Sequence, residues 1–99
     1  MNTETVKRDL EEIKFYYANQ TDFDLAAKSI GESAVLVKIK RYTEAIVKAP
    51  AMLYGIYVAL YVNGMTQFDY ATDYKRSTDY VGKLHAQLCQ YLSEYFGGV

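Results

Sequence analysis

Residues 64–85 read GMTQFDYATDYKRSTDYVGKLH and carry the strongest structural signal in this 99-residue chain. The pattern predicts two short helices joined by a tight turn, with Thr66 as the N-cap of the first helix and Ser77 as the N-cap of the second. Ala71 falls where the two helices would press together, which requires a small side chain. Three more side chains are expected to be buried where the second helix packs on the first: Tyr74, Val81 and Leu84.

Two helices in this order form a helix-turn-helix, whose second helix enters the major groove of DNA. Lys75 and Arg76 would reach the DNA backbone from the turn, and Asp79 would accept only from the N4 amino group of cytosine. Thr66 and Gln67 would donate to a phosphate at the start of the first helix. The alternative is that all of these are ordinary solvated residues. The complete set of expected DNA-contacting residues is Thr66, Gln67, Lys75, Arg76, Ser77, Thr78, Asp79 and Lys83.

The rest of the chain has few helix breakers, one proline and six glycines, which favours a single all-α domain of five to six helices. Residues 1–49 supply the N-terminal helices. A first helix is expected over residues 5–17, a short one over 22–30 that Gly31 ends, and a longer one over 32–48. The expected buried stripe of the first helix is Val6, Leu10, Ile13 and Tyr17. That of the longer helix is Val35, Ile39, Tyr42 and Ile46, widened by Leu36 and Thr43.

Pro50 marks the sharpest boundary, because proline disfavours helix at the preceding residue yet fits the first turn of a new helix. We expect that helix over residues 50–62, and Gly64 after it in a left-handed conformation. The last helix continues almost to residue 97. The expected buried faces are Leu53, Ile56, Tyr57 and Leu60 in the first of these helices, and Leu84, Leu88, Tyr91, Leu92 and Tyr95 in the last.

The formal net charge of −1 counts against simple DNA binding, because phosphate neutralisation supplies most non-specific affinity. This total hides a division along the chain. Residues 1–35 hold four basic and seven acidic side chains, whereas residues 36–50 hold four basic and one acidic. The basic set Lys38, Lys40, Arg41 and Lys48 is either a second phosphate-contacting face, if it lies beside the second helix of the motif, or a solvated helix surface.

No residue pattern points to catalysis, a cofactor or a metal. His85 and Cys89 are one helical turn apart, but they are the only histidine and cysteine, so no metal site is expected. The acidic pairs Asp22/Asp24 and Glu11/Glu12 are explained by capping and solvation. The chain is therefore not expected to be an enzyme.

A cytoplasmic location without a membrane segment is expected. A single cysteine excludes an internal disulfide and suits a reducing compartment. The N-terminus has no apolar signal segment, and the apolar run at residues 52–62 is too short to cross a bilayer.

The chain contains eleven tyrosines and no tryptophan. Tyr54, Tyr57 and Tyr61 lie at helical spacing before the motif, and Tyr91 and Tyr95 do so on the last helix. They form either a homodimer or protein-binding face, where tyrosine is enriched, or the edge of a tyrosine-rich monomer core.

Residues 49–92 resemble region 4 of bacterial sigma-70-type sigma factors and the small phage regulators built like it. The N-terminal half resembles phage proteins of the ArpU or sigma-like type. The matching features are Pro50, an apolar stripe, the Gly64-Met65-Thr66 turn, and Ala71 at the centre of the next helix. The tight turn, a Ser/Thr cap and the recognition helix complete the pattern. The family usually has glycine and then an apolar residue at the turn, where this chain has Lys75 and Arg76.

The resemblance implies a bacterial or phage transcriptional regulator whose helix from Ser77 enters double-stranded DNA and which recruits or redirects RNA polymerase. A single small domain would gain specificity as a homodimer on a palindromic site. The alternative is a protein-interaction module that has the helix-turn-helix without DNA binding, such as a phage inhibitor of host machinery. The acidic pI of about 5.7, Asp79 and the tyrosines suit this alternative. A third interpretation is a structural dimer module.

Overall fold

The computed structural model describes residues 1–20 and 34–97, and within these ranges the chain is all-α, with no strand. The elements are α1 (Thr3–Ala18), α3 (Ala34–Ile46), α4 (Ala51–Tyr57), the π-helical turn η1 (Val58–Val62), α5 (Gln67–Asp73) and α6 (Thr78–Gly97). The helix predicted at residues 22–30, with Gly31 and the pair Asp22/Asp24, lies outside the described residues.

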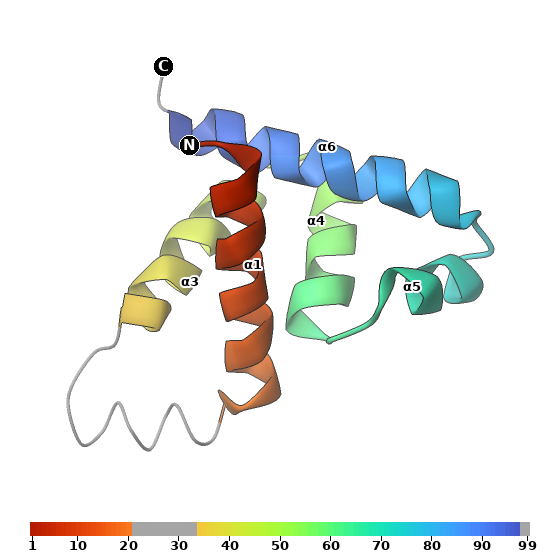
Figure 1. Ribbon diagram of the computed structural model, residues 1–99, viewed down its shortest axis with the longest axis horizontal. Helices are drawn as coiled ribbons and strands as arrows, with labels where there is room; N and C mark the ends of the chain where they lie inside the picture. The colour runs from red at the N-terminus through yellow and green to blue at the C-terminus, as the bar shows by residue number, and fades with distance from the viewer. Residues whose placement is uncertain (21–33, 98–99) are drawn as a thin grey trace.

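The long helix α6 crosses the ends of the other helices and contacts α1, α3, α4 and α5 (Figure 1). Its predicted stripe is confirmed at Leu84, Leu88 and Leu92, which are at most 4% exposed. Tyr95 is 38% exposed, so its predicted burial is wrong. Cys89 completes the buried face, because it lies next to Leu88 and Leu92 on the inner side of the helix.

Helix α1 begins earlier than predicted, because the Asn2 side chain accepts a 2.8 Å hydrogen bond from the Thr5 amide and caps it. The predicted stripe is confirmed at Val6, Leu10 and Ile13, all fully buried. Tyr16, rather than the half-buried Tyr17, continues this stripe. Tyr16 comes three positions after Ile13, a spacing that keeps both side chains on one helical face.

Helix α3 packs through Ile39, Tyr42 and Ile46, as predicted. The prediction that Thr43 widens this stripe is wrong, because Thr43 is exposed and Ala45 is fully buried in its place. The hydroxyl of Tyr91 donates a 2.8 Å hydrogen bond to the carbonyl of Ala45. This bond links α6 to α3.

The helix predicted over residues 50–62 divides into α4 and the π-helical turn η1, with Pro50 as the N-cap. All four predicted inner side chains of this segment are buried. Tyr61, four positions after Tyr57, is buried as well, at 6% exposure. Gly64 follows at φ +74°, the left-handed conformation expected of it.

Candidate nucleic-acid interface

Helix α5 starts with a reciprocal cap between Thr66 and Asp69. The Asp69 amide donates to the Thr66 hydroxyl oxygen at 3.0 Å, and the Thr66 amide donates to Oδ2 of Asp69 at 3.1 Å. The predicted N-cap is therefore confirmed. Because the Thr66 amide donates within this cap, the groups left to donate to a phosphate are the Thr66 hydroxyl and the N–H groups of Gln67.

The turn after α5 closes with Lys75 in the left-handed region, at φ +54°. The Arg76 amide donates to the Ala71 carbonyl at 2.9 Å, and the Lys75 amide donates to the Thr72 carbonyl at 3.3 Å. This pair of bonds is a Schellman motif, which usually has glycine at the left-handed position. A lysine there accepts backbone strain and adds a positive charge at the tip of the turn.

Helix α6 begins at the predicted cap, because the Tyr80 amide donates to the Ser77 hydroxyl oxygen at 3.0 Å. Ala71, Val81 and Leu84 are all buried between α5 and α6, as the sequence predicts. The Oε1 atom of Gln67 lies 4.0 Å from where a Cβ on Gly82 would stand. The start of α5 and the second turn of α6 therefore approach one another closely.

The predicted burial of Tyr74 is wrong, since this side chain is 57% exposed. Tyr74 is the C-cap of α5 and directly precedes the left-handed Lys75. The helix therefore ends at Tyr74, and its side chain does not continue the buried face of α5. Its ring stacks on that of Tyr70, with centroids 4.4 Å apart. The guanidinium of Arg76 lies over the Tyr80 ring, 5.1 Å from its centroid.

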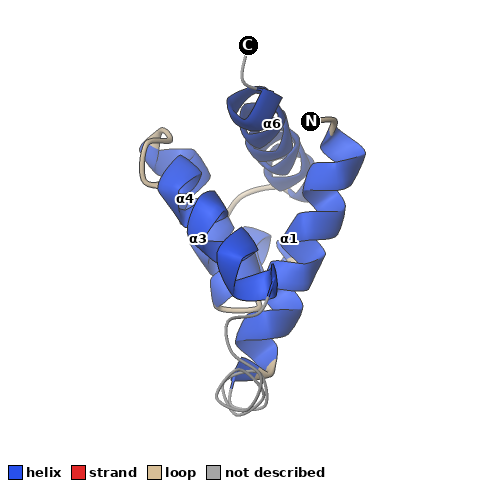
Figure 2. Ribbon diagram, turned by 90° about the vertical axis from the view of Figure 1, so that its left-hand side faces the viewer, coloured by secondary structure: helices blue, strands red, loops and turns tan. Residues whose placement is uncertain are grey.

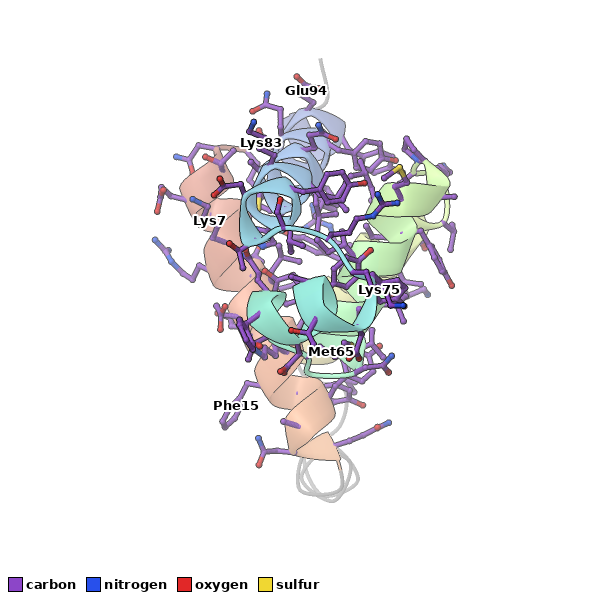
Figure 3. All side chains as sticks on the ribbon, turned by 90° about the vertical axis from the view of Figure 1, so that its right-hand side faces the viewer. Lys7, Phe15, Met65, Lys75, Lys83 and Glu94 are labelled. Atoms are coloured by element: carbon purple, nitrogen blue, oxygen red, sulfur yellow. The ribbon has the colours of Figure 1, made fainter. Side chains whose placement is uncertain are left out.

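All eight residues predicted to contact DNA are exposed, and they follow one another from the start of α5 to the second turn of α6. Figure 3 shows Lys75 beside the end of α5 and Lys83 on α6, both on the side that faces the viewer. The local charge is balanced over residues 64–85. Lys75, Arg76 and Lys83 are matched by Asp69, Asp73 and Asp79.

Three members of the basic set on and after α3 make their contacts away from this surface. Arg41 lies over the ring of Phe96, and Lys48 lies over that of Tyr95, so both sit at the far end of α6 (Figure 1). Thr78 and Tyr95 are 17 positions apart on α6, which is about 26 Å along the helix axis. Lys38 is also engaged elsewhere, in ion pairs with two carboxylates of α1.

No known protein family, curated protein or solved structure matches this chain.

Aromatic residues form a part of this surface that the predicted contact set does not include. Phe68 is 68% exposed, Tyr70 stacks on the exposed Tyr74, and the Tyr80 ring lies under the guanidinium of Arg76. The sequence does contain tyrosines on both sides of Lys75 and Arg76. Because the predicted interior includes Tyr74, the sequence does not indicate an aromatic surface there.

His85 and Cys89 form part of a partly buried polar chain. A hydrogen bond joins the Tyr61 hydroxyl to His85 Nε2, and His85 Nδ1 lies 4.0 Å from Cys89 Sγ. Burial lowers the pKa of His85 and raises that of Cys89, which keeps both groups uncharged at neutral pH. Among residues 1–20 and 34–97, no group of three metal-ligating side chains could hold an ion.

The tyrosines before the motif divide between core and surface. Tyr57 and Tyr61 are 3% and 6% exposed and belong to the core, whereas Tyr54 is 46% exposed. The first two cannot form a dimer seam without unfolding. None of the described helices is both long and apolar enough to span a bilayer.

Proposed function

We propose that this chain binds double-stranded DNA through residues 66–83 and acts as a transcriptional regulator. The observation that carries the proposal is the turn, where Lys75 and Arg76 stand exposed between two capped helices. The second of these helices presents Thr78, Asp79 and Lys83 outward. In the DNA complex, the start of α6 lies in the major groove and the turn cations meet phosphates.

Recognition in this complex divides between two kinds of contact. Lysine and arginine fix the register on the backbone, and the polar groups of α6 read base edges, with Asp79 selecting cytosine through its N4 amino group. The resemblance to sigma region 4 supports action through RNA polymerase. The cytoplasm is the compartment in which such a regulator works. A homodimer on a palindromic site would double the contact area and thereby sharpen the specificity.

Fluorescence anisotropy with duplex DNA in a KCl series tests this proposal. Three cation–phosphate contacts give a salt slope of about −2.7, which is about a 40-fold loss of affinity between 50 and 200 mM salt. Changing Lys75, Arg76 and Lys83 together to alanine should abolish this slope. The matched control changes the exposed Arg8, Lys40 and Lys48 to alanine, which removes the same net charge elsewhere on the surface.

The two triple variants separate a local site from general charge. The proposal requires the control to bind duplex DNA within about threefold of the wild type, since its contacts at residues 66–83 are intact. Absence of binding to any duplex at the lowest salt, or equal losses in both triple variants, would overturn it.

A protein partner is the second candidate for this surface, and the exposed Phe68 and Tyr74 favour it, together with the balanced charge. Exposed aromatic anchors dominate protein interfaces, whereas phosphate binding needs a positive excess. Purified bacterial RNA polymerase is the partner to test, by biolayer interferometry. Replacing Phe68 and Tyr74 by alanine should weaken that complex at least tenfold, while the Lys75/Arg76/Lys83 variant binds normally.

A further inference from the structure

Two stacks of flat side chains flank the turn between α5 and α6. Tyr70 and Tyr74 stack ring on ring, with centroids 4.4 Å apart and 27° between the ring planes. The guanidinium of Arg76 lies over the ring of Tyr80, 5.1 Å from its centroid. Burial is the main cause that raises the pKa of Tyr70, but Tyr80 also raises it and Arg76 lowers it, so the two stacks adjoin one another. We call these four residues the turn platform.

Each stack has a packed inner member and an exposed outer member. Tyr70 and Tyr80 are partly buried and pack against the hydrophobic core. Tyr74 is 57% exposed, and Arg76 is exposed as well. A stack covers one face of each outer group and leaves its other face to solvent. The platform therefore presents two flat surfaces, a ring and a guanidinium, on a packed support.

Flat surfaces of this kind are where unpaired nucleotide bases stack, both on aromatic rings and on arginine planes. In a fully paired duplex the faces of the bases are covered by the neighbouring pairs, so the platform would meet only sugars and phosphates. Phosphate contacts alone give limited affinity here, because the three cations of residues 64–85 are matched by three aspartates. Stacking does not depend on net charge, so it supplies affinity that these charges do not.

We propose that the turn platform binds unpaired DNA bases, so that this surface prefers DNA with an unpaired segment over a fully paired duplex. The inference rests on the proposed nucleic-acid function of residues 66–83 and names the DNA structure that they select. The start of α6 holds the paired part, while Tyr74 and Arg76 each stack on a base of the unpaired part beside it. Lys75, at the end of α5 between them in the chain, contacts a phosphate of the unpaired strand (Figure 3).

Three DNA probes with the same flanking sequences test the inference by fluorescence anisotropy. One is fully paired, one has a central bubble of about six unpaired thymines in each strand, and one has the same bubble without its bases. We expect the thymine bubble to bind at least about fivefold more tightly than the paired duplex, the smaller effect of one stacked base. The abasic bubble has the same phosphates and flexibility, so it should bind like the paired duplex.

The outcomes separate this inference from the proposed function. Equal affinity for the paired duplex and the thymine bubble overturns the inference and leaves duplex binding intact. Equal affinity for the thymine and abasic bubbles also overturns it, because the protein then selects a flexible backbone and not bases. Binding of the thymine bubble without any binding of the paired duplex supports the inference and overturns duplex recognition. Absence of binding to all three probes overturns both and leaves the protein partner.

Substitutions at the platform locate the stacking. Tyr74→Ala removes an outer ring and should reduce the preference for the thymine bubble at least about fivefold, and Tyr74→Phe, which restores the ring, should regain it. Arg76→Lys keeps the charge without the plane, so it should also lower the preference. Tyr54→Ala is the matched control, because Tyr54 is 46% exposed on α4, which lies beside α3 (Figure 2). A preference that survives Tyr74→Ala, or that is lost equally in Tyr54→Ala, contradicts the assignment.

Discussion

The Tyr42 hydroxyl on α3 donates a 2.6 Å hydrogen bond to Oδ2 of Asp9 on α1. Asp9 is only 7% exposed, and its other oxygen lies 2.9 Å from the ammonium group of Lys38. Lys38 also contacts Glu12 at 2.6 Å, and that bond is the main reason the pKa of Lys38 is raised. A buried carboxylate is tolerated only when both oxygens have partners, so this cluster sets how α1 and α3 dock.

Replacing Tyr42 by phenylalanine tests this cluster. The change keeps the ring and removes one bond to a buried carboxylate, which should lower the free energy of unfolding by about 1.5–3 kcal/mol. Urea denaturation measures the loss. Tyr54→Phe is the matched control, because Tyr54 is exposed, and it should change stability by less than about 0.5 kcal/mol. Equal effects of the two changes would show that Asp9 does not need the Tyr42 hydroxyl.

Lys75→Gly should stabilise the fold while weakening any DNA complex. Lys75 holds φ +54°, and glycine adopts this conformation without the steric cost of a Cβ, a gain of about 1 kcal/mol. Lys83→Gly is the matched control, because Lys83 lies within α6, where glycine costs about 1 kcal/mol. Chemical denaturation should therefore give opposite signs for the two variants. A loss of stability in Lys75→Gly would contradict the cap geometry.

Ala71→Leu should separate α5 from α6. Ala71 is 4% exposed at their contact, and added methylenes in a packed interface cost about 1–3 kcal/mol. Thermal unfolding reports the loss. Ala51→Leu, at the exposed first residue of α4, serves as the control and should be nearly neutral. A stable Ala71→Leu variant would mean that the two helices do not need a small residue there.

Local rules predicted much of this fold. Apolar spacing located most of the buried stripes, and the caps at Thr66 and Ser77 and the left-handed Gly64 followed from residue type alone. The errors at Thr43, Tyr74 and Tyr95 fall at the edges of a buried face or at the end of a helix, where a few degrees of rotation decide exposure. The π-turn η1 was also missed, because its residues are equally compatible with an α-helix.

Contacts between distant helices could not be predicted in the same way. The sequence leaves Lys38 in either a phosphate-contacting face or a solvated helix surface, yet Lys38 neutralises Asp9, a residue that is 29 positions earlier in the chain. That pairing depends on how α1 and α3 dock, which no local pattern encodes. The sequence also cannot predict that the buried Tyr57 hydroxyl lacks a hydrogen-bond partner, because its surroundings depend on the same docking of distant helices. The eight residues predicted to contact DNA are exposed together, and their contact with DNA stays a prediction.

His85 should make stability depend on pH near neutrality. Burial, and then the charge of Lys7, lowers its pKa below the usual 6.5, so the unfolded chain binds this proton more readily than the folded one. The stabilising contribution is complete above about pH 6.5 and is lost as the pH falls toward the lowered folded pKa. The loss is at most about 1.4 kcal/mol per pH unit for one proton.

The change His85→Gln removes the titrating group and leaves a polar side chain beside Tyr61. The difference between the two proteins therefore reports the pH dependence due to His85 alone, without that of the carboxylates. Urea denaturation from about pH 7.5 to 5.5 should show wild-type stability falling more steeply than that of the variant, with the two curves nearly parallel above pH 7. The difference should remain in high salt, since desolvation is its main cause. Parallel curves throughout would mean that His85 gains a proton as easily in the folded protein as in the unfolded chain.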